Sequence, residues 1–142
     1  MIRRIAVFVL ALSMGGCVTL GGGSTPIVLE GTLWRLVRID EQPITATQDA
    51  RVWPQIRITS ADAVVRGATG CNTFSGPYRA DGTRVGFGPL SATEAACGDA
   101  ALADQERRIL DILVNADGYR IEGRTLNIMI QGRLRMRFEV WR

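Results

Sequence analysis

Apolar and polar residues alternate along much of the chain after residue 27, which predicts β-strands. Residues 55–59 alternate cleanly, residues 60–62 have the composition of a turn, and residues 63–66 read as the returning strand. Residues 33–39 are rich in residues that suit a pleated surface, with apolar groups on both faces. We therefore expect an antiparallel pair over residues 55–66, preceded by a strand over residues 33–39 that is covered on both sides.

The clearest alternation lies near the C-terminus, where two runs within residues 125–140 flank Gln131 and Gly132. A two-residue loop would set Ile128 opposite Arg135 and place an arginine on the apolar face, because a slip of one residue moves every side chain to the other face. A three-residue loop would instead set Ile128 beside an apolar side chain of the second run. We therefore predict an odd, glycine-containing loop with a β-bulge.

One helix is expected over residues 99–114, with Asp99 as its N-cap. Its apolar residues share one face and its charged residues lie opposite; the apolar set is Leu102, Ile109, Ile112 and Leu113, and the charged set is Arg107, Arg108 and Asp111. The fold class predicted is α+β, mainly β: a strongly curved, mixed or mainly antiparallel sheet with one helix packed on it. The length of 142 residues fits a single domain.

Residues 1–16 have the organisation of a signal peptide. Arg3 and Arg4 precede an unbroken apolar run of eight residues, 5–12, and small residues follow it. Eight helical residues reach only about 12 Å, well short of the roughly 30 Å core of a bilayer. We expect export rather than a membrane-spanning helix.

Met14, Gly15 and Gly16 before Cys17 resemble a bacterial lipobox, so we predict that the signal is cut before Cys17 and that this cysteine carries lipid. An ordinary secretory signal with an incidental cysteine is the alternative. Residues 17–26 then form the lipidated cysteine and a flexible tether, and residues 27–142 form the domain. Since residue 18 is Val and not Asp, the expected location is the outer membrane, facing the periplasm.

Lipidation of Cys17 would leave Cys71 and Cys97 as a pair in an oxidising compartment. We predict a disulfide between them. Two buried free thiols are the alternative.

The amino-acid composition excludes several kinds of catalytic and metal-binding site. The chain has no histidine, which excludes serine–histidine and cysteine–histidine catalysis and histidine-ligated metals. Removal of the signal would leave 15 arginines against 14 acidic residues, so we expect no nucleic-acid binding. No run has the ligand spacing of a calcium or zinc site, and we expect neither metal nor cofactor.

Four segments in order resemble the motifs of META domains, the HslJ-like family of bacterial envelope lipoproteins. They are GTLWRL at 31–36, GATGCNTFSGPY at 67–78, LSATEAAC at 90–97, where Ala95 replaces the usual Met, and YRIEGRTL at 119–126. The resemblance covers about residues 29–138. It implies a buckled sheet folded into a pseudobarrel with one helix. It implies little about activity, although the family is associated with the envelope, heat-shock expression and drug tolerance.

Several groups of residues could carry chemistry. Cys71 could be a nucleophile, but Asn72 beside it is better explained as a turn residue, with Gly70 and Gly76 supplying unusual dihedrals. The scattered acidic residues show no pairing of the kind that glycoside hydrolysis needs.

Arg133, Arg135 and Arg137 form a ladder on one strand face that could contact lipid phosphates or an anionic polysaccharide, or could simply be solvated and neutralised by acidic neighbours. The three tryptophans could line a cleft, although core packing or edge coverage explains them as well.

We therefore predict a lipid-anchored, monomeric envelope protein with a binding or structural role in envelope or stress tolerance and no enzymatic activity. Its expected partners are the membrane, through the lipid, and an envelope protein or anionic polymer. A hydrolase acting on cell-wall material and a carrier of small apolar ligands are the alternatives.

Overall fold

The computed structural model describes residues 26–47 and 49–141. The predicted signal peptide, the lipidation site Cys17 and nearly all of the tether lie outside these ranges. Within them, no helix combines the length and the apolar character needed to cross a membrane.

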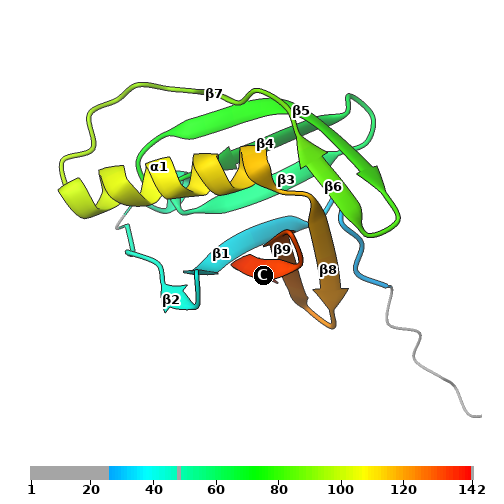
Figure 1. The fold of residues 1–142 in the computed structure, drawn as a ribbon. Coiled ribbons are helices and arrows are strands. Elements are labelled where there is room, and N and C mark those ends of the chain that lie inside the picture. Colours follow the sequence, from blue (N-terminus) through cyan, green and yellow to red (C-terminus); the bar gives the residue numbers. More distant parts are fainter. Residues whose placement is uncertain (1–25, 48, 142) are drawn as a thin grey trace, which may run out of the picture.

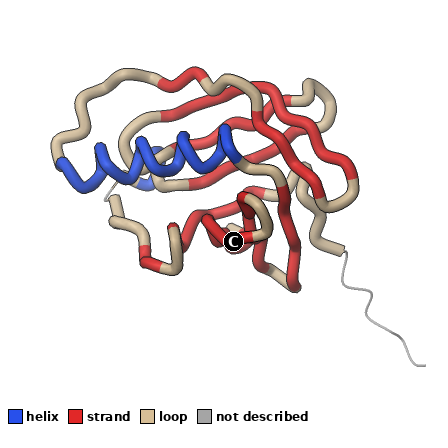
Figure 2. The backbone as a smooth tube through the Cα atoms, viewed as in Figure 1, coloured by secondary structure: helices blue, strands red, loops and turns tan. Residues whose placement is uncertain are grey.

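Strands dominate the described residues (Figures 1 and 2). In chain order the elements are β1 (Leu33–Ile39), β2 (Gln42–Pro43), the 3-10 helix η1 (Ala50–Val52), β3 (Gln55–Thr59), β4 (Val64–Ala68), β5 (Thr73–Asp81), β6 (Arg84–Phe87), β7 (Ser91–Ala92), α1 (Ala100–Asn115), β8 (Gly118–Glu122), β9 (Thr125–Ile130) and β10 (Arg133–Val140).

Eight of the described strands close into a barrel in the order β10-β9-β8-β6-β5-β4-β3-β1, because β10 pairs with β1 as well as with β9. The strand ladders are antiparallel, and an isolated parallel bridge joins Glu30 to Ile58. The short β2 and β7 lie outside this ring and pair with β1 and β5. The prediction of a mainly β pseudobarrel with a helix is confirmed.

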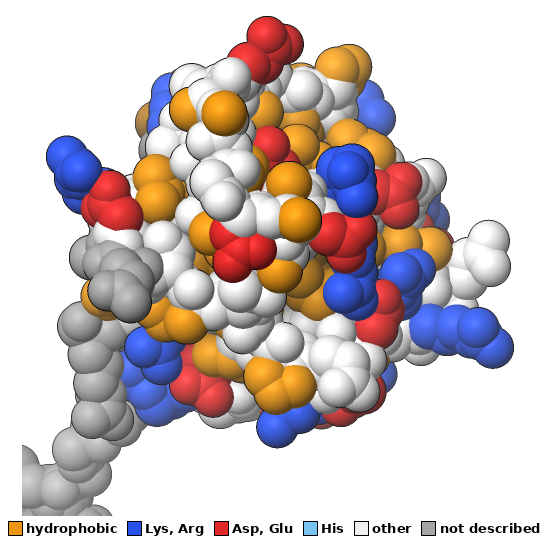
Figure 3. Space-filling model, turned by 90° about the vertical axis from the view of Figure 1, so that its left-hand side faces the viewer, with side chains coloured by type: hydrophobic (Ala, Val, Ile, Leu, Met, Phe, Trp, Pro, Cys, Tyr) orange, Lys and Arg blue, Asp and Glu red, His pale blue; other side chains and the backbone are white. Residues whose placement is uncertain are grey.

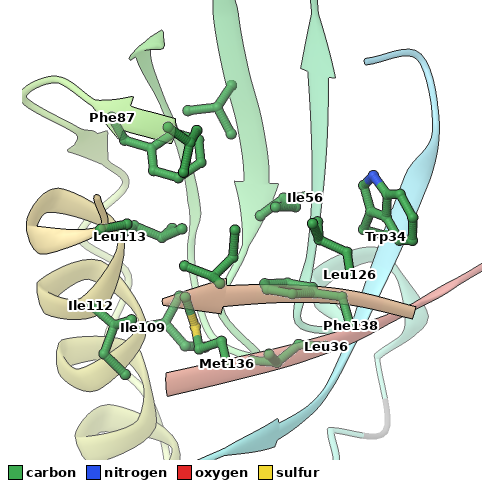
Figure 4. Packing of buried hydrophobic residues seen from close by; sticks show 14 of the residues in the cluster. Trp34, Leu36, Ile56, Phe87, Ile109, Ile112, Leu113, Leu126, Met136 and Phe138 are labelled. Carbon is green, nitrogen blue, oxygen red and sulfur yellow. The ribbon is translucent and has the colours of Figure 1, made fainter. Parts of the chain in front are cut away.

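The barrel interior is filled with side chains (Figure 4). Strand residues that alternate inward meet the apolar face of α1, so one continuous core joins sheet and helix. Its most buried large members include Trp34, Leu36, Ile56, Ile109, Leu113, Leu126, Met136 and Phe138. The helix therefore belongs to the core and is not a surface addition.

The helix begins where the sequence predicts. Asp99 is its N-cap, and its carboxylate accepts a hydrogen bond from the backbone N–H of Ala101 at 2.7 Å. Ile109, Ile112 and Leu113 are buried as expected. Gln105, a polar residue, is buried on the same face.

The predicted odd loop between the last two strands is wrong, whereas the predicted bulge is present. Gln131 and Gly132 form a two-residue turn, both with positive φ (50° and 74°), as the primed turns of tight hairpins require. The extra residue lies inside the strand, because the register shifts at Arg135 and sets Ile128 opposite Met136. The one-residue shift that keeps the apolar side chains on one face therefore occurs inside β10 and not in the turn.

Candidate functional site

Asn72 lies in the segment of residues 67–78, which we call the central motif, and is 3% exposed. Its side-chain Nδ2 donates to the carbonyl of Ala95 and to Oε1 of Glu106, both at 3.1 Å. Its Oδ1 accepts from the backbone N–H of Ala95 at 2.9 Å and from the hydroxyl of Thr93 at 2.8 Å. One amide therefore joins the β4–β5 turn, the segment after β7 and helix α1.

Thr69 and Gln105 complete this cluster. The hydroxyl of Thr69 donates to Oε2 of Glu106 at 2.6 Å and accepts from the N–H of Asn72 at 3.0 Å. Gln105 donates to the carbonyl of Thr69 at 3.0 Å and accepts from the N–H of Thr45 at 2.7 Å. Sequence reasoning missed Gln105, and its signal was a polar residue on an otherwise apolar helix face.

The motif glycines meet two different needs. Gly70 has a φ of +106°, and a Cβ there would lie 2.9 Å from Nε2 of Gln105. Gly76 lacks a positive φ, so the expectation of an unusual dihedral at this position is wrong. A Cβ on Gly76 would instead lie 2.6 Å from the carbonyl oxygen of Pro89, so the requirement there is space.

The disulfide between Cys71 and Cys97 is confirmed, with Cα atoms 5.5 Å apart. Both sulfurs lie close to Glu106, but sulfurs bonded to each other cannot act as thiolate metal ligands. The polar side chains of Thr69 and Asn72 and the sulfur of Cys71 thus all join the central motif to other segments of the fold.

The structure separates the members of the arginine ladder. Arg135 forms an ion pair with Asp40, which Arg108 of α1 also contacts at 3.1 Å. The hydrogen bond from Arg135 lowers the pKa of Asp40 below its usual value and raises the pKa of Arg135. Arg137 lies 3.8 Å from the carboxylate of Glu41.

Arg133, the first residue of β10, is exposed. Two of the three ladder arginines therefore have acidic neighbours, and the role of the ladder in binding stays a prediction. On the face shown in Figure 3, basic and acidic side chains are likewise interspersed.

The tryptophans have separate roles. Trp34 is a core residue, and its indole N–H donates to the carbonyl of Leu29 at 3.0 Å. Trp53 and Trp141 meet edge to face with ring centroids 6.1 Å apart. The guanidinium of Arg35 lies 5.9 and 5.3 Å from their centroids, so the pair covers an arginine at the sheet surface.

A groove of about 600 Å³ lies on the outer face of β3, β4, β5 and β7, and we call it the outer groove. Its lining consists of Leu33, Arg51, Gln55, Arg57, Arg66, Gly67, Ala68, Thr73, Phe74, Ser75, Ser91, Ala92 and Thr93. The lining thus holds three arginines and four hydroxyl side chains, with no acidic residue among them. This is the volume typical of sites for small ligands, about 300–1,000 Å³.

Two further grooves carry mixed charge. One of about 680 Å³ beside β5 and β6 has Arg79 and Arg84 with three acidic residues in its lining. The other, of about 630 Å³ beside Trp141, includes Arg35, Arg124 and Glu139. Of these three grooves, the outer groove is the one whose charged lining is purely positive.

The META domain profile matches residues 28–140, nearly the whole of the described chain. The chain belongs to the META domain family. Two motifs of this META domain, residues 67–78 and 90–97, supply both cysteines of the disulfide and, together with Gln105 and Glu106 of α1, build the Asn72 cluster. No curated protein matches the chain.

Three solved structures share the fold of the META domain. One is described only as the NMR structure of a protein; it has a TM-score of 0.63 and 18% identity, and the match covers 79% of this chain and 91% of that one. An NMR structure of a protein from Burkholderia xenovorans has a TM-score of 0.61 and 17% identity over 84% and 96% of the two chains.

The third is the crystal structure of a DUF4847 family protein from Bacteroides vulgatus, with a TM-score of 0.55 and 14% identity over 79% and 94%. At these identities the likeness concerns the fold alone, and the function must be argued from this chain's own surface.

Proposed function

We propose that this protein is a lipid-anchored component of the bacterial envelope that binds a partner through the barrel surface and catalyses no reaction. The observation that carries the proposal is the use of the central motif. Asn72, Thr69, Gln105 and the two cysteines are all engaged inside the fold, so the motif is a structural device.

The filled interior argues against the carrier alternative, which needs an apolar cavity of a few hundred Å³. The three grooves described above do not supply such an apolar cavity, because each of them is lined in part by arginines. Among the described carboxylates, Glu106 of α1 contacts the central motif, where it accepts hydrogen bonds from Thr69 and Asn72. These bonds favour a positioning role for Glu106 in the fold over one as an acid or base of a hydrolase.

The proposed anchor places the barrel close to a membrane. Nine residues, 18–26, separate Cys17 from the first residues of the domain. Fully extended, they span at most about 30 Å. The N-terminal end of the barrel would therefore lie within that distance of the lipid face.

The anchor is tested by Cys17→Ser, with Thr19→Ser as the matched control. Diacylglycerol and an N-acyl chain together hold a protein firmly, whereas a single acyl chain binds only marginally. We expect Cys17→Ser to leave the membrane fraction or to accumulate with its signal attached, and Thr19→Ser to fractionate like the parent. A Cys17→Ser protein that is processed and fractionates like the parent would refute lipidation there.

The binding role is tested by crosslinking in cells, followed by incubation of the purified protein with cell-wall material. We expect a reproducible crosslinked partner and no release of soluble fragments. Hydrolysis of that material, abolished by a single carboxylate replacement such as Glu106→Gln in a protein that still folds, would overturn the non-catalytic proposal.

A further inference from the structure

We propose that the outer groove binds an acidic polysaccharide. The inference rests on the proposed binding role and names its site and its class of ligand. It also moves the expected anionic contact away from the ladder on β10 to the other side of β1.

The floor of the groove places two arginines directly opposite each other. Arg57 on β3 pairs in register with Arg66 on β4, and Leu33 on β1 lies on the other side of Arg57. Directly opposed side chains in an antiparallel pair have Cβ atoms about 5 Å apart, and like charges there are destabilising. A bound anion between the two guanidinium groups would remove this repulsion.

Carboxylates near the groove pair with two of its three arginines and leave Arg57 unpaired among the described residues. Asp62 holds Arg66 at 2.7 Å, and Asp49 holds Arg51 at 2.8 Å. The hydrogen bond from Arg66 lowers the pKa of Asp62 below its usual value. Arg57 has no carboxylate partner within the described part of the chain.

The two existing ion pairs are exposed, and such pairs contribute little to stability. Arg51 and Arg66 can therefore turn from their own carboxylates toward a ligand at small cost. A guanidinium also matches a carboxylate with two parallel hydrogen bonds, which gives it orientation as well as charge.

Hydroxyl groups continue the same row beyond the arginines. Ser75 on β5 lies opposite Arg66, and Ser91 on β7 lies opposite Ser75. Both serines are exposed, so their hydroxyls can donate to and accept from sugar hydroxyls. The row from β3 to β7 crosses three strand spacings, or about 14 Å.

That length favours a polymer over a single small anion, which would contact two or three groups at one point. The shape favours a chain over a lipid surface, because the row lies in a groove lined by Arg51 of η1 as well as by β7. A ligand with acid groups and hydroxyls spaced along one chain satisfies the arginines and the serines together.

The test uses the full chain, exported by a bacterial host and purified in a neutral detergent, with polygalacturonate as the probe and neutral dextran as its uncharged counterpart. We expect polygalacturonate to bind, more weakly as salt rises, and dextran to bind at least tenfold more weakly. Arg57→Ser should weaken binding at least tenfold. Arg133→Ser removes the same charge from an exposed position of the ladder and should change affinity less than twofold.

A second variant separates binding from folding. Arg57→Glu places a carboxylate opposite Arg66, which replaces a like-charge pair with an opposite-charge pair. We expect its thermal midpoint to equal or exceed that of the parent while polygalacturonate binding is abolished. Parent-like binding by both Arg57 variants would overturn the proposal.

Three further outcomes would each refute the proposed ligand or the proposed site. Equal loss of binding in Arg133→Ser would transfer the contact to the ladder and refute the groove. Tighter binding of inorganic phosphate, or of vesicles with an anionic phospholipid, with the same dependence on Arg57 would replace the polysaccharide with that ligand. If polygalacturonate fails to bind while the anchored protein still crosslinks a partner, the groove inference fails and the proposed function stands.

Discussion

The side-chain amide of Asn72 joins three segments of the META domain that are far apart in the sequence. Its partners Ala95 and Glu106 lie 23 and 34 residues further along the chain. The sequence identifies a turn residue at this position, because asparagine is favoured in turns. It does not identify the partners, because periodicity within one element carries no information about which distant backbone group will face the turn.

Replacement of Asn72 by Ala should therefore cost more than loss of a turn preference. The change leaves the backbone N–H and carbonyl of Ala95 and the Glu106 carboxylate without their partner. Ala95 is exposed and Glu106 is half-buried, so water can replace part of these hydrogen bonds, and we expect about 1–3 kcal/mol less free energy of unfolding. Denaturant titration measures it, with exposed Ser75→Ala as the control at below about 0.5 kcal/mol. A loss as small as that of the control would show that the amide is dispensable.

Strand β10 has an irregular register with both of its neighbours, β1 and β9. The register shifts at Val37 on β1 and at Arg135 on β10, and the backbone N–H of Asp40 donates to the carbonyl of Arg135 at 2.8 Å. The apolar pattern shows that a slip is needed between β9 and β10. It does not show where the slip occurs, since a turn and a bulge restore the same inward alternation. The bulged Arg135 is contacted by Asp40, through its backbone N–H and its carboxylate, and the sequence pattern gives no sign of this distant partner.

Asp40 makes this element pair sensitive to acid. Its pKa is lowered chiefly by the hydrogen bond from Arg135 and further by Arg108 of α1. A carboxyl whose folded pKa is depressed contributes stability above its unfolded pKa, near 3.8, and loses it as the pH falls toward the folded value. Asp40→Asn keeps the positive φ of 48° that asparagine tolerates, so the change isolates the charge.

We expect Asp40→Asn to lower the free energy of unfolding by about 1 kcal/mol at pH 7, a value reduced by the partial exposure of the pair. The difference from the parent should shrink below pH 4, because the parent carboxyl becomes protonated there. Denaturant titrations at pH 7, 5 and 3 measure it. Exposed Asp104→Asn, whose carboxylate pairs within α1, is the control. A difference that stays constant across these pH values would exclude the charge as its cause.

At the scale of the whole molecule, the sequence predicts where each strand and helix lies in the chain better than it predicts which strands lie side by side. The strand and helix ranges follow from alternation, capping and apolar faces. The order around the barrel does not, because β8 follows α1 in the chain yet lies next to β6. The outer groove could not be predicted from the sequence either. Arg57, Ser75 and Ser91 belong to three separate strands, and only the strand register brings them into one row.

The barrel has a weak seam between β6 and β8, where the ladder consists of the single pair Arg84 and Gly118. Helix α1 precedes β8, and its buried residues share the core with Val85 and Phe87 of β6. The segment that leads into α1 is fixed to the β4–β5 turn by the disulfide and by Asn72. We therefore expect the disulfide to support this seam through the helix.

Removal of the disulfide should therefore weaken the whole domain. Closing a loop with a sequence separation of 26 residues stabilises a fold by about 3–4 kcal/mol on the chain-entropy model. We expect the Cys71→Ala, Cys97→Ala double variant to lose about this much free energy of unfolding, and the parent in reducing agent to match it. Exposed Ser75→Ala is the control, because it retains both disulfide cysteines and should unfold close to the parent's denaturant midpoint. Peptide mapping without reduction should find Cys71 joined to Cys97 in exported protein; a free thiol at either position, or unchanged stability after reduction, would refute the stabilising role of the bond.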